Sequence, residues 1–130
     1  MDEGIGFVDL QATLPHFARR FLSATTKVRF RPSYFPFTEP SAELDVECQI
    51  CHGKGCPACK QTGWMELLGC GMVHPTVLTN CGVDAERFTG WALGLGPGRT
   101  DMQRYDVPDL RLMSGGDMRF LRQLAGQVGG

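Results

Sequence analysis

The sequence predicts an α+β protein built on an antiparallel sheet with flanking helices. Helix-like and strand-like segments are mixed along its 130 residues without the regular alternation that a doubly wound sheet requires. The segments 27–31 and 90–96 show the alternating pattern of strands buried on one face. With 42% apolar residues, a chain of this length can bury one modest core, so we expect one compact unit.

The first predicted element is an amphipathic helix. Between Val8 and Leu22 the apolar residues recur at spacings of three and four, which places them on one helical face. Pro15 lies inside this pattern. It would either kink the helix or delay its start, because proline cannot donate the hydrogen bond of a helix interior.

Three strands are predicted between this helix and the middle of the chain. Charged and apolar residues alternate at 27–31, and Leu44 with Val46 indicates a second short strand. The apolar run 64–72 predicts a central strand. Two glycines, Gly69 and Gly71, interrupt this run and indicate a bulge or a close contact.

The rest of the chain predicts short helices around one more strand. His74-Pro75 opens a helix that reaches about Asn80, since proline loses no needed hydrogen bond in a first turn. Segment 90–96 is the strand, and a helix follows at 97–105. Asp117 is expected to cap a last helix that ends at Leu124, and the tail 126–130 is expected to fray.

Charge and composition exclude several functional classes. The net charge is −1, so no overall field attracts the chain to nucleic acid or to anionic lipid. The acidic start Met1-Asp2-Glu3 lacks the apolar core of a signal peptide, and no run approaches the roughly 18 apolar residues of a membrane span. We therefore expect a cytoplasmic setting with no membrane partner.

A segment rich in aromatics and prolines, 29–40, is typical of a binding site. In extended chain, residues two apart point to the same face, so Phe35 and Phe37 present two rings together. Pro36 stiffens the backbone between them. Two ordered rings can hold a flat apolar ligand.

Four cysteines predict a structural zinc site within the loop 47–64. They form two x2 knuckles separated by four residues: Cys48, Cys51, Cys56 and Cys59. Four thiolates complete a tetrahedral shell and leave no open position for catalysis. The spacing locally resembles the zinc centre of J-domain chaperones. Free thiols or a redox pair is the alternative, and His52 could also replace one cysteine. The isolated Cys70 and Cys81 are interpreted as small buried apolar residues.

The strand 90–96 has two unlike faces. One carries large side chains and the other is almost bare: Trp91, Leu93 and Leu95 against Ala92, Gly94 and Gly96. The bare face is explained equally well by a neighbouring helix or by a bound ligand. If a ligand lies there, Arg99 in the next helix could offer a forked donor to a phosphate.

Four segments together resemble the C-terminal half of the catalytic domain in the α subunit of bacterial phenylalanyl-tRNA synthetase, a class II enzyme. The segments are residues 29–43, 68–75, the motif 3 pattern Gly94-Leu95-Gly96-x-x-Arg99, and 117–124. The resemblance covers nearly the whole chain, so residues 1–130 are expected to be part of that domain, with the zinc loop as an elaborated hairpin turn.

The resemblance implies a role for each site residue. The substrate-binding set would line the pocket for the phenylalanine ring, with Ala92 and Gly94 as its floor: Phe35, Phe37, Thr38, Ala92 and Gly94. Arg99, with Gly96 beside it, would meet the phosphates of ATP. Glu39 would hold Mg²⁺ together with the β subunit.

The implied reaction is the ATP-dependent activation of phenylalanine and its transfer to tRNA(Phe). The implied partner is the β subunit of an α2β2 heterotetramer, and the implied cofactors are Mg²⁺ and a structural Zn²⁺. Motifs 1 and 2 are absent, so we expect no adenylate formation by the chain alone. Pro97-Gly98 and Thr100-Asp101 depart from motif 3 and could loosen its helix. The alternatives are a paralogue that only binds an amino acid and a zinc-dependent interaction module. An unpaired sheet edge would favour aggregation or a partner.

Overall fold

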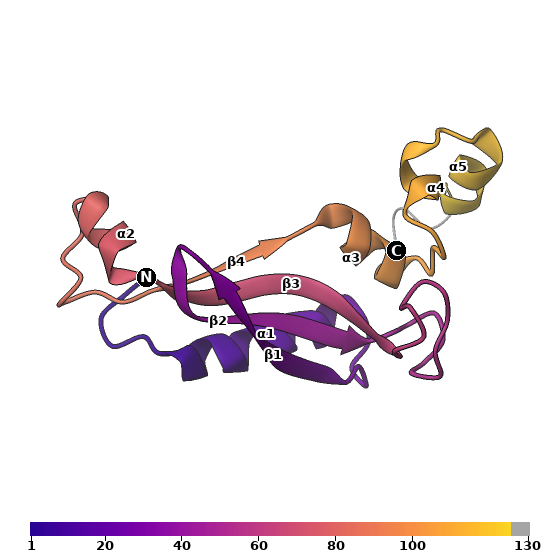
Figure 1. Cartoon of the computed structure of the whole chain (residues 1–130). Coiled ribbons are helices and arrows are strands. Elements are labelled where there is room, and N and C mark those ends of the chain that lie inside the picture. The colour runs from indigo at the N-terminus through magenta and orange to yellow at the C-terminus, as the bar shows by residue number, and fades with distance from the viewer. Residues whose placement is uncertain (126–130) are drawn as a thin grey trace.

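The computed structural model describes residues 1–125 and consists of one four-stranded sheet with helices on one face and at both ends (Figure 1). Its elements, in chain order, are α1 (Phe7–Phe21), β1 (Val28–Phe35), β2 (Thr38–Glu47), β3 (Trp64–Val73), α2 (Pro75–Asn80), β4 (Trp91–Leu95), α3 (Pro97–Arg104), α4 (Arg111–Ser114) and α5 (Met118–Leu124). The predicted fraying of 126–130 lies outside the described residues. No helix of residues 1–125 has both the length and the apolar character needed to cross a bilayer.

The strands form an antiparallel meander in the order β1-β2-β3-β4, which confirms the predicted α+β class. The register aligns Arg31, Glu43, Gly69 and Gly94 in one row across the sheet. This row lies on the face away from α1, because its neighbours Leu44 and Cys70 point into the core. The sheet therefore has one apolar face and one face on which charged residues and glycines gather.

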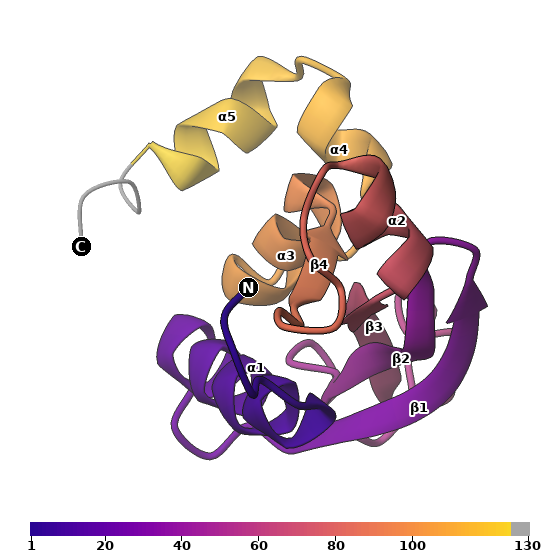
Figure 2. The same cartoon turned by 90° about the vertical axis from the view of Figure 1, so that its left-hand side faces the viewer.

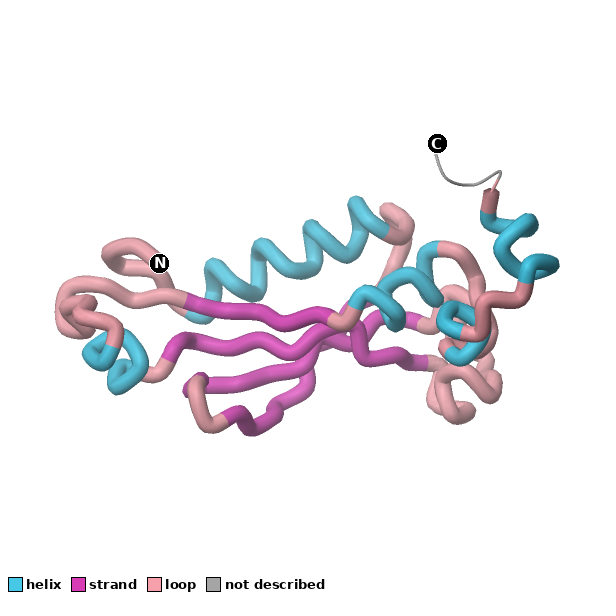
Figure 3. Tube along the Cα trace, turned by 90° about the horizontal axis from the view of Figure 1, so that it is seen from above, coloured by secondary structure: helices cyan, strands magenta, loops and turns pink. Residues whose placement is uncertain are grey.

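Helix α1 lies along the apolar face of the sheet, as Figure 3 shows from above, and confirms the predicted helix. Leu10, Leu14 and Ala18 are fully buried, one turn after another, against β1, β2 and β3. The helix continues through Pro15, so the interpretation that Pro15 delays its start is wrong. Burial of Leu10 and Leu14 stabilises the turns before the proline and offsets its missing hydrogen bond.

The strands β1 and β2 are longer than the alternation alone predicted. The hairpin between them turns at Pro36 and Phe37, so most of the aromatic and proline segment is part of the sheet. Pro32 is accommodated because β1 is an edge strand, where a missing ladder hydrogen bond costs least. Leu44 and Val46 lie in the second half of the ten-residue strand β2.

The glycines of β3 mark close contacts. A Cβ built on Gly69 would lie 2.9 Å from Cζ of Phe35, and one on Gly71 would lie 2.6 Å from the carbonyl oxygen of Pro40. The register between β2 and β3 is irregular at two places, between Thr38 and Ser41, next to Gly71, and between Leu44 and Asp45, opposite residues 66–68. The predicted close contact is confirmed for both glycines, and a register irregularity also adjoins Gly71.

The helices α2, α3 and α5 match the predictions closely, and α4 was not predicted. The carboxylate of Asp117 accepts a hydrogen bond of 2.9 Å from the backbone N–H of Arg119, as expected of a cap. Helix α2 and the N-terminus lie at one end of the sheet (Figure 1), while α5 extends away from the strands (Figure 2).

Two apolar clusters stabilise the molecule. The larger lies between α1 and the sheet. The smaller joins the cysteine loop to α3 and the segment after it, and its buried members are Cys48, Cys59, Met65, Met102 and Val107. The loop and α3 lie at the same end of the sheet in both Figure 1 and Figure 3.

Candidate functional site

A cavity of about 290 Å³ opens on the sheet face away from α1. Its walls come from the β1–β2 hairpin, β3 and β4, and it is lined by Phe35, Phe37, Thr38, Glu43, Glu66, Gly69, Cys70, Ala92, Leu93 and Gly94. Every residue of the predicted substrate-binding set is in this lining. The structure thus brings together two segments that lie more than fifty residues apart in the sequence.

The aromatic wall is made by two stacked rings. The centroids of Phe35 and Phe37 lie 5.9 Å apart with an interplanar angle of 18°. The Phe35 ring rests on Gly69, where a side chain would collide with it, and Phe37 is 56% exposed. Thr38, the first residue of β2, is buried, and its hydroxyl lies 2.6 Å from the hydroxyl of Ser41. The hairpin is therefore fixed at its base and open at its tip.

The opposite wall is the bare face of β4. A Cβ built on Gly94 or on Gly96 would meet no atom within 4 Å. Among the described residues, therefore, no helix covers this face, and the alternative of a neighbouring helix is wrong here. The other face of β4 is less well packed than predicted: Trp91 contacts the core, but Leu93 and Leu95 are 40% and 39% exposed.

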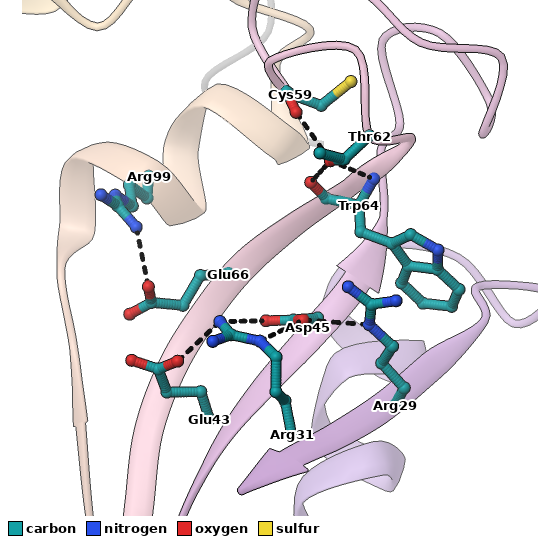
Figure 4. A network of polar contacts seen from close by, with 9 residues as sticks. All are labelled: Arg29, Arg31, Glu43, Asp45, Cys59, Thr62, Trp64, Glu66 and Arg99. Carbon is teal, nitrogen blue, oxygen red and sulfur yellow. Dashed lines mark hydrogen bonds and ion pairs between the residues drawn. The ribbon is translucent and has the colours of Figure 1, made fainter. Parts of the chain in front are cut away.

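Two carboxylates that the sequence analysis did not identify line the polar side of the cavity. Glu43 forms an ion pair of 2.6 Å with Arg31, and Glu66 forms one of 3.2 Å with Arg99 (Figure 4). The alternation of strand 38–47 could have placed Glu43 on the cavity face, two residues from Ser41. A register irregularity lies between Glu66 and Leu68, so period-two counting back from Gly69 along β3 would not have placed Glu66 on the cavity face.

A buried carboxylate organises the arginines of β1. Asp45 is 2% exposed and accepts hydrogen bonds from Nε of Arg29 at 3.0 Å and from Nε of Arg31 at 3.1 Å (Figure 4). The hydrogen bond to Asp45 raises the pKa of Arg31 above its ordinary value, so the guanidinium stays charged beside Glu43. Arg29 lies over the ring of Trp64, 4.4 Å from its centroid. This network connects β1 to β2 on the sheet face beside the cavity.

Arg99 lies in the first turn of α3, which begins at Pro97 with Gly96 as its N-cap. The buried hydroxyl of Thr100 donates a hydrogen bond of 2.9 Å to the carbonyl of Gly96. The buried hydroxyl of Thr100 is thus satisfied within the first turn of the helix. Arg99 and Gly96 lie outside the lining of the aromatic cavity, and Arg99 lines a neighbouring cavity of about 600 Å³. Its ion pair with Glu66, which lines both cavities, connects the two, and its side chain stays about half exposed.

Glu39 lies outside the cavity lining. Its side chain is 79% exposed, and one oxygen lies 3.8 Å from Nε2 of His74. An exposed carboxylate beside an imidazole can contribute a ligand to a divalent cation, but only with ligands from elsewhere.

The four cysteines predicted to hold zinc converge in the loop between β2 and β3. Their sulfurs all lie within 4.8 Å of one another, with separations of 3.8 Å for Cys48 and Cys56, 3.7 Å for Cys51 and Cys59, and 3.6 Å for Cys56 and Cys59. Sulfurs about 2.3 Å from a central zinc form a tetrahedron with edges of roughly 3.8 Å. The residues present therefore fit the ion, and His52, which is exposed, is not among them.

The surroundings of the four sulfurs differ, and they favour the thiolate form at Cys59. Burial raises the pKa of Cys48 to about 12. Burial also opposes ionisation of Cys59, but hydrogen bonds from the backbone N–H groups of Cys56 and Gly63 outweigh it and lower the pKa to about 6. Gly63 has φ +76°, and a Cβ there would lie 2.5 Å from the carbonyl oxygen of Gly53, so the loop closes only around glycine.

The two isolated cysteines have different environments. Cys70 is 3% exposed, as predicted, and burial raises its pKa to about 11. Cys81 is exposed, so its interpretation as a buried residue is wrong. It caps the C-terminus of the short helix α2, where the chain turns at the surface.

The comparisons with known proteins agree on one family. The profile of the family described as tRNA synthetases class II core domain (F) matches residues 1–124. The chain is 57% identical over 123 residues to the phenylalanine–tRNA ligase α subunit of Parabacteroides distasonis. It is 54% identical to the proteins of that name from Chloroherpeton thalassium and Chlorobaculum parvum.

Each of these alignments covers 95% of this chain, which in turn spans 36% of the length of each relative. The four-stranded antiparallel sheet and its flanking helices are the part of the family domain that these residues build. On the extent of the profile match, the chain belongs to the class II tRNA synthetase core domain family.

Proposed function

We propose that this segment contains the phenylalanine-ring pocket of a phenylalanine–tRNA ligase α subunit. The observation that carries the proposal is the cavity in which the stacked rings of Phe35 and Phe37 face the bare strand at Ala92 and Gly94. Its volume is at the small end of the range for ligand sites, roughly 300–1,000 Å³, and suits a single aromatic side chain. The names of the relatives support the same substrate.

Arg99 is proposed as the catalytic residue that meets ATP, with Gly96 allowing the nucleotide close to the backbone. In the reaction the carboxylate of phenylalanine attacks the α-phosphate and pyrophosphate leaves. The ribose hydroxyl at the 3′ end of tRNA(Phe) then attacks the adenylate, and AMP leaves. Neither step needs a protein nucleophile, so catalysis depends on positioning and on cations that offset phosphate charge. Glu66 would hold the Arg99 guanidinium at the cavity edge until the phosphates arrive.

The remaining assignments follow from the family and stand as proposals. Glu39, exposed beside His74, would contribute to a Mg²⁺ site that a β subunit completes in an α2β2 assembly. The segment Gly94 to Arg99 would be motif 3, and the cytoplasm the place of action. The four-cysteine loop would hold a structural Zn²⁺, whose chemistry is to cross-link a loop that is otherwise too short and polar to fold.

The pocket is tested by isothermal titration of the chain with phenylalanine and with alanine. We expect heat only from phenylalanine, because alanine leaves the space between the two walls empty. Equal binding of both, or of neither, would refute the ring pocket.

The ligase assignment is tested in the enzyme assembled from full-length α subunits and its β partner. Replacement of Arg99 by Lys keeps the charge but loses the bidentate fork, so phenylalanine-dependent pyrophosphate exchange should fall about 10²-fold. Arg122→Lys, on α5, is the control. Phenylalanine binding without any pyrophosphate exchange in the wild-type assembly would favour a module that only binds the amino acid.

A further inference from the structure

We propose that the four-cysteine loop, when it holds Zn²⁺, is a positioning element for Arg99. The metal fixes the loop, the loop fixes α3, and α3 sets where the Arg99 guanidinium lies beside Glu66 of the cavity lining. That Arg99 acts on nucleotide phosphates rests on the proposed function. The coupling between the loop and α3 rests on the contacts of these residues alone.

The first link is apolar. Cys48 and Cys59, two of the four sulfur donors, are 0% and 5% exposed and belong to one cluster with Met102 of α3 and with Val107. These two cysteines would therefore bind the metal through their sulfurs and also form part of the apolar surface on which α3 packs. A bound ion fixes both sulfurs to the rest of the loop, so the helix packs against a rigid surface.

The second link is a buried polar contact. Gln103 is 2% exposed, and its Oε1 accepts a hydrogen bond of 3.0 Å from the backbone N–H of Gln49, which directly follows Cys48. Its amide nitrogen donates to the sulfur of Met65 on β3. A buried amide with both ends satisfied fixes α3 in rotation as well as in distance, because any displacement leaves a polar group unpaired.

The third link is the helix itself. Arg99 and Gln103 are four residues apart, so they lie on one face of α3, and both point to neighbouring residues of β3: Arg99 to Glu66 and Gln103 to Met65. Thr100, Met102 and Gln103 are the buried residues of α3. Two of these three contact the loop cluster or Gln49.

One further contact of α3 involves another element. The guanidinium of Arg104 donates to the carbonyl of Phe21 and lies over the Phe21 ring, 4.8 Å from its centroid. This contact is on the surface at the end of α1, and it restrains the C-terminal end of α3. The N-terminal turn, where Arg99 lies, is restrained by the buried Thr100 and by Leu110 against Gly98, and Gln103 and Met102 are the residues that connect α3 to the loop. Misplacement of a catalytic group by about 1 Å can reduce a rate about 10²-fold.

The coupling is tested on the chain by amide hydrogen exchange with Zn²⁺ bound and after removal with a chelator. Metal analysis first establishes the content, and less than one zinc per two chains would overturn the proposal. We expect the amides of residues 100–107 to exchange at least tenfold faster after removal, while the β1–β2 hairpin is unchanged. Unchanged exchange in α3, or an equal increase in all elements, would also overturn it.

A variant separates the coupling from metal binding. Gln103→Met keeps the length of the side chain but removes the acceptor for Gln49, so zinc content should stay the same while residues 100–107 lose protection. Gln103→Glu keeps an acceptor oxygen and should restore part of that protection. Gln123→Met, the same change at an exposed position of α5, is the control. Normal protection of α3 in Gln103→Met would refute the positioning role.

In the assembled enzyme, Gln103→Met should raise KM for ATP about tenfold and leave KM for phenylalanine unchanged. Loss of a residue that supports a functional group typically costs about 10–100-fold, and we expect the lower end of that range. A general loss of stability would change KM for ATP and KM for phenylalanine together, and that result would count against the proposal. If the wild-type enzyme shows no phenylalanine-dependent exchange of pyrophosphate, the proposed function fails. The hydrogen-exchange result still decides the coupling in that case.

Discussion

At the scale of single residues, the cavity depends on side chains that are small. Gly69 leaves space for the ring of Phe35, and Gly94 leaves the opposite wall open. Ala92 is the one small side chain with a Cβ on that wall, so its methyl group sets the depth of the space. A substitution at each of these positions should therefore change a different measurable property of the protein.

Replacing Ala92 by Gly should let the enzyme accept para-substituted phenylalanines. The change removes one methyl group from the wall that faces the rings, and one methylene-sized difference in a pocket is worth about 10–200-fold in discrimination. The measurement is kcat/KM for para-chlorophenylalanine relative to phenylalanine in the assembled enzyme. Cys81→Ser, at an exposed position remote from the pocket, is the control. An unchanged ratio would refute the assignment of Ala92 to the pocket.

Gly94→Ala should weaken phenylalanine binding without loss of stability, whereas Gly71→Ala should lower stability. A Cβ at Gly94 meets nothing within 4 Å, so the free energy of unfolding should change by less than about 0.5 kcal/mol while phenylalanine affinity falls. A Cβ at Gly71 would lie 2.6 Å from the carbonyl oxygen of Pro40, so unfolding should become easier by about 1–3 kcal/mol. Urea unfolding and titration calorimetry measure the two quantities. Equal destabilisation by both changes would contradict this description of the cavity.

At the scale of elements, α1 supports the sheet face opposite the cavity. Its buried leucines contact strands on which every second residue points to the cavity. The position of the cavity residues therefore depends on the packing of α1, although α1 contributes no residue to the lining.

Leu14→Ala should destabilise the chain by about 2–5 kcal/mol, the usual cost of deleting a fully buried leucine side chain. Leu14 is 1% exposed, whereas Val8, on the same helix, is 75% exposed and provides Val8→Ala as the control. The free energies of unfolding come from urea titrations followed by circular dichroism. A cost below about 1 kcal/mol for Leu14→Ala would show that α1 does not stabilise the sheet.

At the scale of the whole molecule, the sheet of the described residues ends on both sides in an edge strand. β1 carries two arginines and a proline, which are typical protections of an edge. β4 has no such protection, and two of its leucines, Leu93 and Leu95, are about 40% exposed. Of the two edges, β4 is therefore the less protected, and we expect another strand or subunit to cover it.

The isolated chain should self-associate through β4. Replacing Leu95 by Lys puts a charge on the exposed apolar face of this edge and should shift the chain toward the monomer. Light scattering after size-exclusion chromatography, over a range of concentrations, measures the shift. Leu112→Lys tests the same change at a similarly exposed leucine of α4. If both variants behave as the wild type does, β4 is not the contact surface.

Much of this fold could be predicted from the sequence because its signals are local. The three-and-four spacing of α1, the alternation of β1 and the caps of α2 and α5 depend only on neighbouring residues. The four cysteines could be grouped by spacing alone, because a tetrahedral metal site restricts how far apart its ligands lie in the chain.

Other features could not be predicted because they depend on contacts between distant residues. The register irregularity between Glu66 and Leu68 decides that this carboxylate faces Arg99, and no regular period along β3 shows it. Whether Pro15 interrupts α1 depends on how well Leu10 and Leu14 are buried. Cys70 and Cys81 look alike in the sequence, but one faces the core and the other ends a surface helix.

The sequence by itself determined the α+β class, most elements, the cysteine cluster and the two segments that carry the pocket residues. Only the tertiary structure decided that the bare face of β4 stays open, that Glu43 and Glu66 join the cavity, and that the cysteine loop contacts the helix of Arg99. The physical reason is the range of the interactions. Turns, caps and periodic burial depend on residues a few positions apart, whereas a cavity depends on how the register of four strands aligns side chains more than fifty residues apart.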